Sequence, residues 1–235
     1  TVIGGGGNLA SGKMHIMDTL KAGIPSEYKF TAPREAEGKK NDGLFVDFLW
    51  RNPDDNISFV IKTPEGKETK PLDSGSQLFT LGNFNIYYSR DVSSKGTVMF
   101  KVSLSRLDSG AANGKWSITA KSNSDEIFDG FIADVTQSWS GPTHWESTKL
   151  TDERTVTFPS TADSCLAIGA YIVNYEWPGF GAINDLCSYS GRGFNIDGKI
   201  GIDICAPGHT TFTTAVNNSY GIFSGTSSAA PHVVG

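Results

Sequence analysis

The chain has 235 residues, of which 38% are hydrophobic and 19% charged, with 27 Gly and 10 Pro. This balance excludes a disordered polymer and indicates a soluble, turn-rich globular protein. The formal charge of −5 and the pI of about 5.3 argue against nucleic acid or an acidic membrane as a partner. No apolar run approaches the roughly 20 residues needed to cross a bilayer, so no membrane span is expected.

The cysteines and the two chain ends bound the interpretation further. Cys165, Cys187 and Cys205 lie in the last third, without a Cys-x-x-Cys pair or a His at zinc-finger spacing. Three buried thiols are the simplest expectation, and one disulfide plus one thiol is the alternative, so the redox compartment stays open. The chain starts at Thr1 without a basic leader and stops at Gly235 within a helical pattern. Both ends are therefore expected to be cut from a longer polypeptide.

The first 145 residues change character after a glycine-rich start. Residues 1–24 hold a short apolar run, four consecutive glycines at 4–7 and a mixed polar and apolar stretch. Residues 25–145 then alternate strand-like runs with turn clusters, which predicts an all-β sandwich. The eight expected strands are 27–31, 44–50, 57–63, 77–81, 83–89, 97–103, 115–120 and 126–136.

Two turn signals separate these strands. Thr-Pro-Glu-Gly-Lys at 63–67 predicts a hairpin turn, because Pro presets φ and Gly takes a positive φ. Asn113-Gly114 predicts a second hairpin.

Aromatic and apolar side chains are expected to form the core of the sandwich. Strict alternation places Trp116, Ile118 and Ala120 on one strand face. The same reasoning groups Phe45 with Phe48 and Trp50, although less cleanly.

The last 80 residues have a different pattern. Near-continuous apolar runs at 165–171 and 201–208 end in turn formers, which suits strands buried on both faces of an α/β sheet. The chain closes on Phe-Ser-Gly-Thr-Ser-Ser-Ala-Ala-Pro-His-Val-Val-Gly at 223–235. Ser227 falls at the expected start of a helix, where unpaired N–H groups and the helix dipole can stabilise an oxyanion. Pro231 is expected in the first turn, where its missing N–H has no partner; for a lone serine, an ordinary N-cap is the alternative.

Four segments in order carry a resemblance to one family. The 223–235 segment resembles the nucleophile motif of the subtilisin-like serine proteases (subtilases, peptidase family S8), with only Val234 departing from it. Asp-Ile-Cys-Ala-Pro-Gly at 203–208 is similar to the family's strand and turn, and 187–193 is similar to its Phe-Ser-Ser-x-Gly segment. Residues 158–170 are similar to its Pro-Ala-x-x-x-x-Val-Ile-Ala-Val-Gly-Ala run.

The resemblance implies a serine endopeptidase that cleaves polypeptides through an acyl-enzyme at Ser227. Gly-Gly-Gly-Asn at 5–8 is similar to the family's oxyanion segment, so Asn8 is the expected oxyanion donor; a plain turn is the alternative reading of these residues. The expected substrate-binding residues form the S1-pocket wall and the turn before the nucleophile: Gly5, Gly6, Gly7, Gly225 and Thr226. No cofactor is required.

The spacing of the two expected catalytic residues implies an insertion. Asn8 and Ser227 are 219 positions apart, several times the separation in compact subtilases. This arrangement is similar to a bacterial subset that includes the clostridial germination proteases, in which a jelly-roll domain follows the oxyanion Asn. The expected fold is an α/β catalytic fragment with a mostly parallel sheet (1–24 and 146–235), interrupted by an all-β, jelly-roll-like sandwich (25–145).

Two parts of a serine-protease site are missing from the sequence. A serine nucleophile needs a general base and a carboxylate that orients it, and the family's Asp-Thr/Ser-Gly and His-Gly-Thr motifs are absent. His232 lies five residues after Ser227, about 140° around the helix, and is expected to face away from it. The isolated chain is therefore expected to be inactive, and the upstream segment that carries Asp and His is an expected partner.

Other interpretations remain open. A pseudoprotease, or a regulatory or binding protein that uses the sandwich to bind a partner or ligand, is the alternative function. Acidic turns at Asp42-Gly43 and Asp54-Asp55-Asn56 are candidate calcium ligands, although such residues are more often simple turns. The resemblance suggests a secreted or cell-surface bacterial protein. The exposed edges and apolar surface of a truncated sheet favour self-association.

Overall fold

A computed structural model describes residues 2–54, 56–174 and 181–235. The chain forms two compact units: unit 1 comprises Thr1–Ser11 and Asp152–Gly235, and unit 2 comprises Gly12–Thr151. The boundaries of these units differ from the boundaries at residues 24 and 145 that the sequence predicted. The reason is that strand β2 (His15–Leu20) pairs with a strand of unit 2, and Ile16 also bridges to Leu150.

Unit 2 contains two antiparallel sheets. The first has the order β2, β12 (Glu126–Asp134), β6 (Gly43–Trp50), β10 (Val98–Arg106), β9 (Phe84–Val92) and β8 (Ser76–Leu81). The second has the order β13 (His144–Glu146), β3 (Ser26–Ala32), β11 (Gly114–Lys121) and β7 (Ser58–Lys62). A short pair, β4 (Glu35–Ala36) and β5 (Lys39–Lys40), is separate. All eight expected strands are present, whereas β2 and β13 were not predicted.

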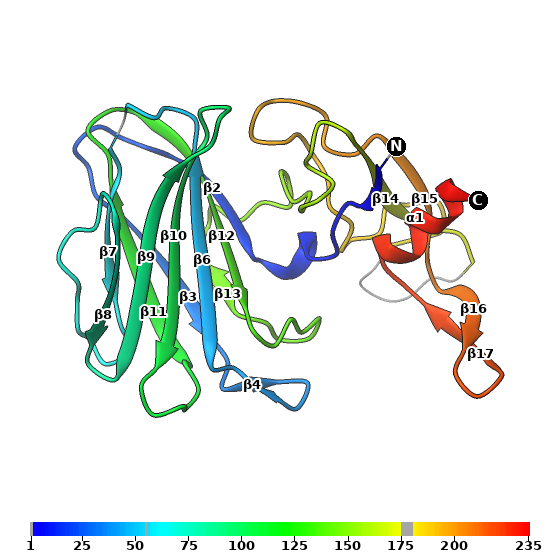
Figure 1. Cartoon of the computed structure of the whole chain (residues 1–235), viewed down its shortest axis with the longest axis horizontal. Coiled ribbons are helices and arrows are strands. Elements are labelled where there is room, and N and C mark those ends of the chain that lie inside the picture. The colour runs from blue at the N-terminus through cyan, green and yellow to red at the C-terminus, as the bar shows by residue number, and fades with distance from the viewer. Residues whose placement is uncertain (1, 55, 175–180) are drawn as a thin grey trace. The chain divides into compact units, whose positions relative to one another are not determined.

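The two sheets meet through aromatic side chains. The ring of Phe59 on β7 lies 4.6 Å from that of Phe48 and 4.4 Å from that of Phe100, both in the other sheet. Phe84 and Trp116 make a further contact between the sheets at 4.7 Å. Figure 1 shows β9 and β10 in front of β11.

Strand alternation accounts for the core, with one exception. Trp116, Ile118 and Ala120 are at most 1% exposed, as the alternation predicts. Phe48 and Trp50 are also fully buried, but Phe45 is 39% exposed. An odd residue separation puts Phe45 on the opposite face of β6, so its assignment to the core was wrong.

One of the two expected hairpins forms. At 63–67, Gly66 has φ +80° and its N–H donates to the Thr63 carbonyl at 2.9 Å. Asn113-Gly114 does not close a hairpin, because β10 and β11 belong to different sheets.

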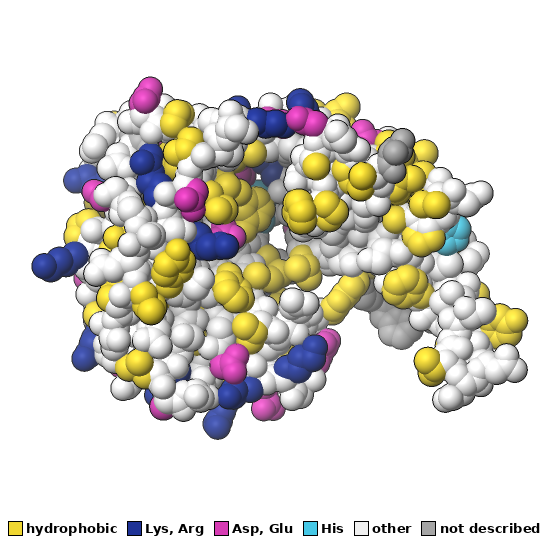
Figure 2. Space-filling model, viewed as in Figure 1, with side chains coloured by type: hydrophobic (Ala, Val, Ile, Leu, Met, Phe, Trp, Pro, Cys, Tyr) yellow, Lys and Arg dark blue, Asp and Glu magenta, His cyan; other side chains and the backbone are white. Residues whose placement is uncertain are grey.

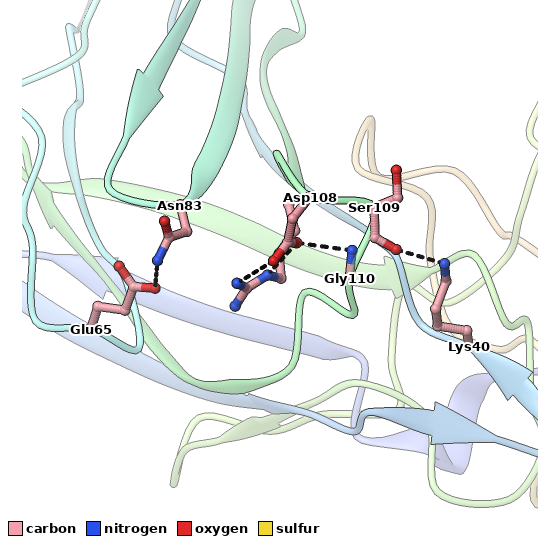
Figure 3. A network of polar contacts seen from close by, with 7 residues as sticks. Lys40, Glu65, Asn83, Asp108, Ser109 and Gly110 are labelled. Atoms are coloured by element: carbon pink, nitrogen blue, oxygen red, sulfur yellow. Dashed lines mark hydrogen bonds and ion pairs between the residues drawn. The ribbon is translucent and has the colours of Figure 1, made fainter.

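The connection between β10 and β11 is held by polar contacts (Figure 3). The Asp108 carboxylate accepts two 2.8 Å hydrogen bonds from the Arg106 guanidinium and one from the Gly110 N–H. Lys40 donates to the Ser109 carbonyl at 2.7 Å. These contacts fix the chain as it crosses from one sheet to the other.

A buried carboxylate fastens the segment after β12. Asp134 is 4% exposed and accepts hydrogen bonds from the N–H and hydroxyl groups of both Thr136 and Thr143. Burial alone would raise the pKa of Asp134, but these four donors outweigh it and hold the pKa below its usual value.

Unit 1 contains a three-stranded parallel sheet in the order β1 (Val2–Gly5), β14 (Cys165–Ile172) and β15 (Ile204–His209). Helix α1 (Thr226–Val234) packs on it, with Ala229 fully buried against Ile168 and Ala170. A one-turn 3-10 helix (Ala10–Gly12) follows β1.

The expectation of a mostly parallel sheet is not borne out for the chain as a whole. In the described ranges, parallel pairing is confined to the three strands of unit 1, and the other strand pairs are antiparallel. Among the residues that the structure describes, α1 is also the single α-helix. The reason is that most strands belong to unit 2, whose two sheets are antiparallel, although only the β8–β9 and β9–β10 pairs are consecutive in sequence.

A second hairpin in unit 1 carries exposed apolar side chains. Strands β16 (Thr211–Ala215) and β17 (Ser219–Phe223) pair with each other, and their register places Phe212, Tyr220 and Ile222 on one face. These side chains are 66–74% exposed. Figure 2 shows hydrophobic side chains on the surface of this hairpin.

The cysteines depart from the expectation of three buried thiols. All three are free, but only Cys187 is buried; Cys165 is half-buried and Cys205 is exposed. Burial raises the pKa of the Cys187 thiol. No helix in the described part of the chain is long and apolar enough to span a membrane.

Replacing Asp134 with Asn should lower the free energy of unfolding of unit 2 by about 2–4 kcal/mol, because an amide cannot accept all four hydrogen bonds. Asp134 has a lowered pKa in the folded state, so its contribution is present above about pH 4 and is lost as the pH falls. Urea unfolding should therefore show a difference between wild type and D134N that shrinks from pH 6 to pH 3. The control D125N removes an exposed carboxylate bonded to Lys21 and the Ala22 N–H. Equal losses in D134N and D125N would contradict this role.

Candidate functional site

The end of β1 lies against the start of α1. The Asn8 side-chain carbonyl accepts hydrogen bonds from the Thr226 backbone N–H at 2.7 Å and from the Thr226 hydroxyl at 3.0 Å. The Gly7 N–H donates to the same hydroxyl oxygen at 3.1 Å. Three hydrogen bonds thus join residues 7–8 to the residue that precedes Ser227.

These bonds determine which way the Asn8 amide points. Both Thr226 groups are donors here, so the oxygen of the amide must face them and Nδ2 must point away. No hydrogen bond to Nδ2 is found within the described ranges. Asn8 therefore keeps two N–H donors available at the turn before α1.

Two glycines let the strand end and the turn approach each other. A Cβ on Gly5 would lie 2.9 Å from the Thr226 hydroxyl and 3.0 Å from its carbonyl oxygen. Gly225 has φ +128°, and a Cβ there would lie 3.2 Å from Asn8 Nδ2. The Gly225 N–H donates to the Gly208 carbonyl at 2.8 Å, which ties the turn to the end of β15.

Gly6 and Gly7 of the same run also face protein atoms. A Cβ on Gly6 would overlap the Ile202 side chain, and one on Gly7, which has φ +104°, would lie 2.8 Å from the Thr157 hydroxyl. Gly6 and Gly7 therefore allow close packing. Their place in a substrate pocket remains a prediction.

Ser227 is the second residue of α1 and is exposed, whereas Thr226 and Ser228 beside it are buried. The Gly225 carbonyl accepts the N–H groups of Ser228 at 2.9 Å and Ala229 at 3.2 Å. The Ser227 N–H precedes these bonds and has no partner in the described part of the chain. It belongs to the unpaired N–H groups expected at a helix start.

The helix departs from expectation at Pro231. Because α1 begins at Thr226, Pro231 is its sixth residue and lies inside the helix. The Ser227 carbonyl therefore lacks its usual i+4 donor, and the first-turn assignment was wrong. His232 is exposed and its Nδ1 contacts the Ser228 carbonyl at 2.9 Å.

Within residues 2–54, 56–174 and 181–235, no hydrogen bond joins the Ser227 hydroxyl to a histidine. The same residues hold no group of three or more His, Cys, Asp or Glu side chains that could bind a metal ion. Of the candidate calcium ligands, Asp55 lies outside the described residues. The site thus consists of an exposed serine, a helix start and an oriented amide.

Comparison with known proteins identifies the family. The model of the subtilase family, Peptidase_S8, matches residues 92–235. The chain belongs to the subtilase family. Subtilisin-like protease 2 of Plasmodium falciparum (isolate 3D7) is 55% identical over 42 residues, which are 18% of this chain and 3% of that protein. This chain thus spans a small part of that relative.

A solved protease structure has a similar fold. The CspB protease of Clostridium perfringens superposes with a TM-score of 0.73 over 97% of this chain and 45% of that chain, at 21% identity. This likeness supports a subtilase-like fold and confirms the expected similarity to clostridial proteases. The segment that resembles the subtilase nucleophile motif, residues 223–235, covers α1 and the turn before it.

Replacing Gly5 with Ala should move the turn before Ser227, because the new methyl group would lie within about 3 Å of Thr226. Overpacking of this kind costs about 1–3 kcal/mol, so amide exchange across α1 should accelerate. Gly221→Ala in β17 is the control, since its new methyl group would make an ordinary contact at 3.6 Å. Equal exchange across α1 in G5A and G221A would show that the close approach of Gly5 is not needed.

Proposed function

We propose that this chain supplies the nucleophile and the oxyanion hole of a serine endopeptidase. The Ser227 hydroxyl attacks the scissile carbonyl of a polypeptide and forms an acyl-enzyme. The Asn8 Nδ2 and the Ser227 N–H bind the oxyanion. The observation that supports this most directly is the pair of hydrogen bonds from Thr226 to the Asn8 carbonyl, because they turn Nδ2 away from the turn as a free donor.

The geometry suits charge that develops during the reaction. Both donors are held before substrate arrives, so little reorganisation is needed when the carbonyl oxygen becomes negative. Removal of one such donor typically lowers kcat by about 10²–10³. The exposed position of Ser227 leaves its hydroxyl open to a substrate chain.

The general base and its carboxylate would come from a segment outside this sequence. His232 contacts the Ser228 carbonyl, and His209 is 5% exposed beside Tyr189. Neither is hydrogen-bonded to Ser227. The isolated chain is accordingly proposed to be inactive and to gain a base from the segment with the family's Asp and His.

Substrate binding would use the glycine run and the turn before the nucleophile. We assign Gly5, Gly6 and Gly7 to the wall of the S1 pocket, with Gly225 and Thr226 beside it. No cofactor is needed for this chemistry, and a calcium site stays a hypothesis. A secreted or cell-surface location and self-association through the exposed hairpin of unit 1 are further parts of the proposal.

Unit 2 would be a jelly-roll-like insertion into the catalytic unit. A second candidate function, a pseudoprotease or regulatory protein that binds a partner through this unit, is favoured by one observation. Phe45, Tyr87 and Leu78 lie in one row across β6, β10, β9 and β8, with Ser103 of β10 between Phe45 and Tyr87. The three apolar side chains are 39%, 39% and 66% exposed, and exposed apolar side chains on an outer sheet face are suited to binding.

Labelling with a fluorophosphonate probe tests the proposal. The chain alone should not react, and adding the segment that carries Asp and His, in trans or in the full-length protein, should produce labelling. Ser227→Ala should abolish it, whereas Ser228→Ala, at the buried neighbouring serine, should retain it. An absence of labelling in the full-length protein would contradict the protease proposal and favour the second candidate.

A further inference from the structure

The carbonyl of Gly208 accepts two hydrogen bonds at the end of β15. One comes from the Gly225 N–H at 2.8 Å and the other from the Tyr189 hydroxyl at 2.9 Å. Gly225 directly precedes Thr226 and Ser227. The Tyr189 hydroxyl thus lies next to the backbone of the nucleophile turn.

Tyr189 is held in place from both sides. Its side chain is 3% exposed within the core of unit 1. The Arg192 guanidinium donates to the carbonyls of Cys187 at 2.8 Å, Ser188 at 2.9 Å and Ser190 at 3.3 Å. These three carbonyls flank Tyr189, so the guanidinium fixes the backbone from which the ring extends. Burial raises the pKa of the Tyr189 hydroxyl, which keeps it protonated and able to donate.

The glycine at position 208 lets β15 lie close to β14 and to the turn before α1. A Cβ on Gly208 would overlap the Ala170 side chain and lie 2.9 Å from the Gly225 carbonyl oxygen. His209 Nδ1 is 3.4 Å from the Tyr189 hydroxyl, a longer contact than the 2.9 Å bond to Gly208. The Gly208 carbonyl points toward its two donors, the Gly225 N–H and the Tyr189 hydroxyl.

We infer that Tyr189 is a positioning residue for the nucleophile turn, acting through the Gly208 carbonyl. Without the Tyr189 hydroxyl, the Gly208 carbonyl can rotate together with the Gly225 N–H that it accepts. The backbone at Gly225, two residues before Ser227, then becomes more mobile. Small displacements of a nucleophile reduce the rate steeply, although substrate binding changes little. The effect on reactivity rests on the proposed function of Ser227; the effect on the turn does not.

The matched pair Tyr189→Phe and Tyr28→Phe tests the inference. Tyr28 is also 3% exposed and its hydroxyl donates to Asp18 at 2.9 Å, but it lies in unit 2. Both variants keep the ring and remove one buried hydroxyl. Amide hydrogen exchange of peptides spanning residues 222–230 should be about fivefold faster in Y189F and unchanged in Y28F.

Reactivity of the full-length protein is the second readout. Fluorophosphonate labelling should have a maximal rate about tenfold lower in Y189F, with the half-saturating probe concentration within about twofold of wild type. Y28F should label like wild type.

The two readouts separate the inference from the proposed function. Unchanged exchange at 222–230 in Y189F would overturn the positioning role, whatever the labelling shows. A wild-type protein that is not labelled at Ser227 would overturn the protease proposal, while the exchange comparison would still decide whether Tyr189 holds the turn.

Discussion

The Asn8 side-chain carbonyl accepts hydrogen bonds from both the backbone N–H and the hydroxyl of Thr226, and the arrangement of the site depends on this contact. It joins residues 218 positions apart and brings the end of β1 to the start of α1. It also leaves the amide nitrogen as the free end of the side chain. Since β1, β14 and β15 are parallel, their carboxyl ends meet at one edge of the sheet. The contact forms at that edge, where ligands of α/β proteins usually bind.

The long interruption between the two halves of unit 1 has a simple physical basis. Unit 2 begins and ends at neighbouring points, because the Thr151 N–H donates to the His15 carbonyl at 3.2 Å and the Met17 N–H donates to the Lys149 carbonyl at 3.1 Å. A domain whose ends lie together can be inserted at a loop without separating the flanking elements. The aromatic core of unit 2 then gives the insertion its own stability.

Local patterns predicted the strands and missed what depends on distant partners. Eight strands of unit 2 followed from alternation and turn residues, which act over a few positions. Strand β13 was not predicted because three residues are too few to show an alternating pattern. Asn113-Gly114 predicted a hairpin that does not form, because the strand that follows it joins the other sheet. The position of Pro231 in the helix was also predicted wrongly, because the helix start depends on a distant residue. Asn8 accepts a hydrogen bond from the N–H of Thr226, the first helical residue.

The site itself was predictable only in part. Ser227 at a helix start followed from small residues and turn chemistry, but the role expected of Asn8 came from the resemblance to subtilases. The contacts of Tyr189 and Arg192 with neighbouring carbonyls left no sequence signal, because nothing in a motif specifies where a hydroxyl points. Close packing accounts for the glycine run at residues 4–7, since a Cβ on any of its four glycines would lie within 3.0 Å of another residue.

A crystal structure of the full-length protein with a phosphonate bound covalently at Ser227 would test the central claim most directly. The account predicts that the phosphonyl oxygen lies within about 3.1 Å of both Asn8 Nδ2 and the Ser227 nitrogen, with the Thr226 bonds to Asn8 intact. A phosphonyl oxygen bound by other donors, with Asn8 turned away or its amide reversed, would contradict it.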